Sequence, residues 1–139
     1  MENRQAEILL IEDSLPDVRL TERALKNGTL TKQVSVVRDG EQALAFLRRQ
    51  GEYANAPRPD IILLDLGLPK KNGAEVLAEI KKDPALKRIP VIVLTTSDAE
   101  EDVLDTYNRH ANAYTKKPVD MDEFVRTIKM IEDFWLSLV

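Results

Sequence analysis

Side chains that could do chemistry follow the apolar runs of this sequence. An acidic pair, Glu12 and Asp13, comes directly after Ile8–Ile11, and Asp65 comes directly after Ile61–Leu64. Carboxylates gathered at one edge of a fold repel one another unless a cation lies between them, and an all-oxygen site of this kind suits Mg²⁺ better than zinc or copper. The three acidic residues therefore predict a magnesium site, with Asp65 as the candidate nucleophile.

Hydroxyl and amine side chains follow the later runs. Two threonines beginning at Thr95 follow Val91–Leu94, and two lysines ending at Lys117 follow the weaker run Ala113–Thr115. A metal, a hydroxyl donor and an ammonium group together can hold the oxygens of a phosphoryl group. The sequence thus favours a phosphoryl-transfer site.

Each of these signals also has a purely structural explanation. An acidic pair after a strand is often the cap region of a helix, and Thr95 could simply mark a helix entry. Lys117 could be a solvated lysine before a turn-forming proline. Asp65 is harder to explain in this way, because ending a buried strand on a carboxylate is costly unless something compensates it. The signals gain weight by recurring at the same end of successive runs.

Alternating strands and helices are expected to position these side chains. Apolar runs without polar alternation suit strands buried on both faces of a parallel sheet, and the five expected strands are 8–11, 34–37, 61–64, 91–94 and 113–115. Helices are expected from Leu15 to Lys26 after a Ser14 cap, from Asp39-Gly40, from Ala74 to Lys82, after Ser97 and after Asp120. This (βα)5 order predicts a doubly wound α/β fold, in which ligands bind outside the carboxyl ends of the strands.

Length and composition narrow the possibilities. The 139 residues fit one domain, and 20 basic against 24 acidic residues give a net charge of −4. That balance argues against nucleic acid and against a polybasic membrane anchor. The sequence has no cysteine, which excludes disulfides and thiolate chemistry and fits the cytoplasm, and no apolar run approaches the length of a membrane span. We expect a single cytoplasmic domain over residues 1–139.

Four strings, LLIEDS, LLDLGLPKKNG, VIVLTTS and YTKKP, occur in this order and resemble the receiver domain of two-component response regulators. The 30 residues from Asp65 to Thr95 and the 22 from Thr95 to Lys117 are similar to the spacing in single-domain chemotaxis receivers. The resemblance runs from about Glu7 to Ile131. It implies a flavodoxin-like sheet of strand order 2-1-3-4-5 and a stand-alone signalling protein, not an enzyme, that is phosphorylated on an aspartate by a sensor histidine kinase.

The resemblance also implies a role for each motif residue. Asp65 matches the phosphoacceptor, Asp13 the direct Mg²⁺ ligand, and Glu12 the acidic residue that acts on the metal through water. The remaining matches are the backbone carbonyl of Gly67 as a further metal ligand, Thr95 as the switch hydroxyl, Tyr114 as the aromatic switch residue and Lys117 as the lysine before proline. Gly67 departs from many relatives, in which a polar side chain at this position affects dephosphorylation.

The end of the chain points to partners. An apolar stripe on the last helix continues beyond the usual length of the family's last helix, and an exposed dimer patch is expected from Val103, Tyr107, Met130, Phe134 and Trp135. The FWLSLV end, the Gly51–Pro59 loop and LPKKNG are similar to response regulators paired with cyanobacterial phytochromes. This similarity implies a red-light-sensing kinase and a homodimer through the fourth helix, fifth strand and fifth helix, which would signal by contact with a further protein.

Other functions fit only part of the pattern. A magnesium-dependent aspartyl phosphohydrolase of the dehalogenase type usually has a second aspartate two residues after the nucleophile, where this chain has Gly67. A receiver-shaped adaptor that signals without phosphorylation usually lacks the acidic pair, the acceptor or the lysine, and all of these are present. A nucleotide-binding domain needs a Gly-rich phosphate loop, but the first turn reads EDSLPD. His110, the single histidine, is expected to be a surface residue or one near the end of the fourth helix rather than a phosphodonor, so the phosphoryl donor must be another protein.

Overall fold

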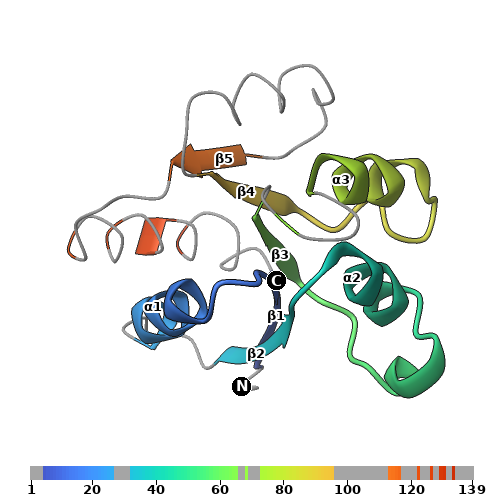
Figure 1. Cartoon of the computed structure of the whole chain (residues 1–139), viewed down its shortest axis with the longest axis horizontal. Coiled ribbons are helices and arrows are strands. Elements are labelled where there is room, and N and C mark those ends of the chain that lie inside the picture. The colour runs from blue at the N-terminus through green and yellow to red at the C-terminus, as the bar shows by residue number, and fades with distance from the viewer. Residues whose placement is uncertain are drawn as a thin grey trace.

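Five parallel strands form one sheet at the centre of the molecule (Figure 1). The computed structural model describes residues 5–26, 32–65, 68, 73–95 and 113–116, and residues 122, 126, 129, 130 and 133. The strands are β1 (Ala6–Ile11), β2 (Lys32–Val37), β3 (Ile61–Asp65), β4 (Val91–Thr95) and β5 (Ala113–Lys116). Their order is β2-β1-β3-β4-β5. The expected α/β fold and strand order are confirmed.

Helices cover both faces of the sheet (Figure 1). One face carries α1 (Leu15–Leu25), and the other carries α2 (Gly40–Leu47) and α3 (Gly73–Lys82). A 3-10 turn, η1 (Gly51–Tyr53), follows α2 in the predicted surface loop. Residues 122, 126, 129, 130 and 133 are helical, as expected after Asp120, while the helix expected after Ser97 lies outside the described residues.

The predicted caps fix where α1 and α2 begin. The Ser14 Oγ accepts a hydrogen bond from the Asp17 amide at 3.4 Å, and the Asp39 Oδ1 accepts one from the Gln42 amide at 2.8 Å. Each bond satisfies an amide that has no partner inside its helix. Since each helix follows the carboxyl end of a strand, the caps set the path of the chain at this edge of the sheet.

Side chains of β1 and β3 alternate between two apolar cores, one on each face of the sheet. Leu9 and Ile11 pack in the core that includes α2 and α3, whereas Ile8 and Leu10 pack in the core that includes α1. All five residues of β3 are buried. A strand that is buried on both faces reads as a continuous apolar run, which is why the sequence reveals it so clearly. The two cores hold the ends of the central strands in place.

The loop after α2 is anchored to the core by one aromatic contact. The rings of Phe46 and Tyr53 lie 5.5 Å apart between centroids, and Tyr53 packs against the core beneath α2. Burial, with smaller contributions from the negative charges of Glu52 and Asp39, raises the pKa of the Tyr53 hydroxyl.

Within the part of the chain that the structure describes, no helix is both long enough and apolar enough to cross a bilayer.

Candidate metal centre

Three carboxylates meet at the carboxyl edge of the sheet. β1 and β3 are neighbours with Ile11 opposite Leu64, so Glu12 and Asp65, the next residues along, emerge at the same level. One carboxylate oxygen from each of Glu12, Asp13 and Asp65 lies within 4.8 Å of the others. The structure therefore brings together the three acidic residues that the sequence predicts to form a site.

Burial strengthens the repulsion among the three carboxylates of this cluster. Glu12 is 1% exposed and Asp65 is 7% exposed, while Asp13 is partly buried. Like charges this close raise the free energy of the folded state, and water near the two buried groups is too scarce to screen them. A cation among the carboxylates removes that repulsion. The donor set consists only of carboxylate oxygens, the ligands that hard divalent cations prefer.

Main-chain contacts hold the acidic turn in position. The Glu12 amide donates to the Val37 carbonyl at 3.0 Å, which extends the β1–β2 pairing by one residue. The Glu12 Oε2 accepts a bond of 3.3 Å from the Ser14 amide. The turn that caps α1 thus also orients the Glu12 carboxylate.

Arg38 is a positioning residue that the sequence reasoning missed. Its Nη2 donates to the Asp13 carbonyl at 2.9 Å, and its own amide donates to the Gln42 Oε1 at 3.0 Å. Arg38 therefore joins the turn after β1, through its guanidinium, to the start of α2, through its main-chain amide. The signal was present in the sequence, because Arg38 directly follows β2, just as Glu12 directly follows β1.

The other predicted site residues are described only in part. Thr95 ends β4, one residue past Leu94, which pairs with Asp65, so its main chain lies at the same edge. Tyr114 lies on β5 opposite Val93. The predicted residues that lie outside the described part of the chain are Gly67, Val103, Tyr107, His110, Lys117, Phe134 and Trp135.

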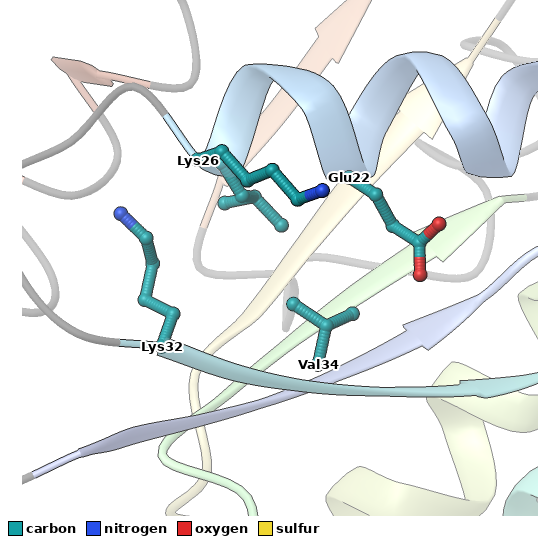
Figure 2. A pocket seen from close by; sticks show the side chains of 5 residues that line it. Glu22, Lys26, Lys32 and Val34 are labelled. Carbon is teal, nitrogen blue, oxygen red and sulfur yellow. The ribbon is translucent and has the colours of Figure 1, made fainter.

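A hollow of about 390 Å³ lies away from this centre, between α1 and β2 (Figure 2). Glu22, Lys26 and Lys32 place charges of both signs around it, and Val34 contributes an apolar surface. Lys26 caps the end of α1 and Lys32 begins β2, so this hollow belongs to the amino edge of the sheet. It is therefore separate from the acidic cluster.

Comparison with known proteins identifies the family. Residues 8–129 match the response regulator receiver domain, so the chain belongs to this family of two-component signalling proteins. The expectation of a non-enzymatic signalling protein agrees with the general character of receiver domains. Neither the phosphohydrolase nor the phosphorylation-independent adaptor is favoured.

Individual relatives narrow the placement within the family. The chain is 53% identical over 132 residues to the response regulator Rcp1 of Synechocystis sp., which covers 95% of this chain and 90% of the relative. The crystal structure of the phosphorylated cyanobacterial phytochrome response regulator RcpA has a TM-score of 0.89 and 53% identity, covering 98% of this chain and 97% of that one. The Mn²⁺-bound form of Rcp1 has a TM-score of 0.86 and 52% identity, covering 96% of each chain. The predicted resemblance to phytochrome response regulators is confirmed.

Proposed function

We propose that this protein accepts a phosphoryl group on Asp65 from a partner sensor histidine kinase and passes the signal on by protein contact. The observation that carries the proposal is the Asp65 carboxylate at the end of buried β3, within 4.8 Å of ligand oxygens of Glu12 and Asp13. A buried strand fixes the direction of the acceptor, and fixed direction is a large part of what an in-line transfer needs. Two further acidic groups beside it supply a place for a cation.

The metal proposed for this site is Mg²⁺. Glu12, Asp13, Asp65 and the backbone carbonyl of Gly67 would hold it, with Asp13 as a direct ligand and Glu12 acting through water. The described donors support this choice because all of them are carboxylate oxygens. When bound, Mg²⁺ offsets the negative charge of the phosphoryl oxygens.

In the transfer step, a carboxylate oxygen of Asp65 attacks the phosphorus of a phosphohistidine on the kinase. The new P–O bond forms as the P–N bond breaks, and the imidazole leaves with the electron pair of that bond. The Lys117 ammonium and the Thr95 hydroxyl are proposed to bind the phosphoryl oxygens. The strand positions of Thr95 and Asp65 at one edge of the sheet support the role of Thr95.

Signalling is proposed to follow from the added charge. A phosphorylated side chain carries about −1.5 to −2 charges. The Thr95 hydroxyl turns toward the phosphoryl group, and Tyr114 takes up the vacated space, which remodels the surface of the fourth helix, β5 and the fifth helix. The pairing of β4 with β5 supports this coupling: Thr95 is opposite Lys116, and Tyr114 is opposite Val93, two residues before Thr95. The protein is proposed to work in the cytoplasm as one receiver domain over 1–139 with an extended last helix.

A phytochrome-class kinase is the proposed donor, because Rcp1 and RcpA are each 53% identical to this chain over nearly its whole length. Phosphoryl transfer from an autophosphorylated phytochrome-type kinase should be about tenfold or more faster than transfer from a chemotaxis-type kinase, since matched interfaces raise the encounter rate. Rapid-quench gels that follow both proteins measure the two rates. Equal rates from the two kinases would overturn the phytochrome pairing without affecting Asp65 as the acceptor.

The proposed homodimer is testable at the one predicted patch residue whose side chain the structure describes. Met130 is helical and 69% exposed, so its apolar side chain is open to contact with a second copy. With beryllofluoride as the phosphoryl mimic, light scattering over a range of concentrations should show a dimer, and Met130→Glu should weaken it about tenfold by placing a charge in an apolar contact. Lys129→Glu, a change at the neighbouring exposed residue, is the control. A monomer under every condition would refute the patch.

A further inference from the structure

A second hollow, of about 270 Å³, lies between the end of α2 and the segment that joins α3 to β4. Its floor is apolar, formed by Leu47, Leu86 and Ile89, and its charged lining consists of three arginines, at positions 48, 49 and 58, and the acidic Asp83. Pro59 precedes β3 and Ile89 precedes β4, so the hollow belongs to the amino edge of the sheet. It is therefore remote from the carboxylates that define the metal centre.

Charge is unbalanced around this hollow. The Arg48 guanidinium is paired, at 3.5 Å from Glu79 Oε1 and 3.6 Å from Asp83 Oδ2. Arg49 and Arg58 instead donate to main-chain carbonyls, Nε to Ala56 at 3.0 Å and Nη2 to Ala85 at 2.7 Å. Neither forms an ion pair within the described ranges. Because a guanidinium has five N–H donors, both retain several for an incoming carboxylate.

The backbone at Arg49 is strained. The Gln50 amide donates to the Ala45 carbonyl at 2.9 Å and the Arg49 amide to the Phe46 carbonyl at 3.2 Å, the two bonds that end a helix with a left-handed residue. That residue is Arg49, with φ of 54°. Glycine is preferred here, because a Cβ atom crowds the neighbouring backbone in this conformation. A left-handed arginine beside a hollow points to a use for its side chain.

The wall of the hollow opposite α2 is already ordered. The Asp83 carbonyl accepts bonds from the amides of Leu86 at 3.0 Å and Lys87 at 2.8 Å. The Lys81 Nζ donates to the carbonyls of Lys87 and Ile89, both at 3.0 Å. A ligand that enters this hollow therefore loses little binding free energy in ordering this wall.

We propose that this arginine-rimmed hollow binds a short acidic segment of a partner protein, with one apolar side chain on the Leu47, Leu86 and Ile89 floor and a carboxylate on Arg49 and Arg58. Arginine suits this role because its planar donors match a carboxylate in a two-point contact. The net charge of −4 disfavours a long polyanion such as nucleic acid, so a short local segment fits better. This surface is independent of phosphorylation at Asp65.

The probe is an acetylated and amidated peptide of sequence EDLFDE, titrated into the ¹⁵N-labelled protein and followed by amide chemical shifts. The expected shifts fall on residues 47–59 and 83–89. The double change Arg49→Glu and Arg58→Glu should weaken binding about tenfold or more, because two attractions become repulsions. The matched control is Lys26→Glu with Lys32→Glu, which makes the same charge change at the hollow of Figure 2 and should leave the affinity within about twofold.

Three results would overturn the proposal: shifts located at another surface, equal weakening by both double variants, or no shifts with millimolar peptide. A peptide in which glycines replace the leucine and phenylalanine tests the apolar floor, and equal binding of this peptide would remove that part of the proposal. If the double glutamate variant does not fold, Arg49→Gly removes one guanidinium while keeping the left-handed turn, and it should still weaken binding.

Discussion

Replacing Asp65 with asparagine should reduce the incorporation of phosphate from acetyl phosphate and Mg²⁺ by about a thousandfold or more. The amide has the shape of the carboxylate but lacks its nucleophilic charge. Since Asp65 ends a fully buried strand, no neighbouring group can move into its position without disturbing the core. Intact-mass spectrometry measures the phosphorylated fraction, and hydroxylamine sensitivity identifies an acyl phosphate.

The matched control for this change is Glu52→Gln. Glu52 is an exposed acidic residue in η1, at the amino edge of the sheet, so it tests whether loss of any carboxylate lowers the signal. This variant should incorporate phosphate at the rate of the unchanged protein. Hydroxylamine-sensitive incorporation at that same rate in the Asp65→Asn variant would show that another residue is the acceptor.

Asp13→Asn should lower the affinity for magnesium and raise the stability of the metal-free protein. Magnesium affinity should fall about a hundredfold or more, because loss of a mere supporting contact to a metal ligand already costs about 10–100-fold. Without metal, the protein should become more stable by about 1 kcal/mol. Two unit charges 4.8 Å apart repel by roughly 3 kcal/mol at an effective dielectric constant of 20, and the partial exposure of Asp13 reduces this.

Isothermal titration with Mg²⁺ measures the first effect, and urea unfolding in EDTA measures the second. Glu41→Gln is the control, because Glu41 is an exposed acid in the first turn of α2, and no oxygen of Glu41 belongs to the cluster. It should change neither quantity as Asp13→Asn does. A drop in the stability of Asp13→Asn in EDTA would show that hydrogen bonds to the carboxylate outweigh its repulsion.

The sheet was predictable because its central strands are buried on both faces. The runs at 61–64 and 91–94 differ from β3 and β4 by a single residue. At the edge the hydropathy signal fails: β2 begins at Lys32 rather than Val34, because Ala6 pairs with Lys32 along β1. Backbone pairing there continues past the apolar side chains, and hydropathy does not record it.

The acidic cluster was predictable for a topological reason. Parallel strands end at one edge, so a carboxylate after each run is enough to bring Glu12 and Asp65 together. The position of Arg38 directly after β2 indicates that it lies at this edge, but its contact with a main-chain carbonyl 25 residues away could not be predicted from side-chain patterns. The second hollow was not predicted, because turns build it and turns leave no regular hydropathy pattern. The left-handed backbone of Arg49 could not be predicted either, because arginine rarely adopts that conformation.

The anchored turn η1 has a practical use. The sequence contains no cysteine, so a cysteine introduced at Glu52 would be the only thiol available for a dye. Tyr53, next to it, is held on Phe46, so the attachment point is ordered even though position 52 is exposed. A fluorophore placed there would lie at the amino edge of the sheet, whereas the acidic cluster lies at the carboxyl edge. Single-molecule recordings of complex formation could then be made without a label beside the phosphorylation chemistry.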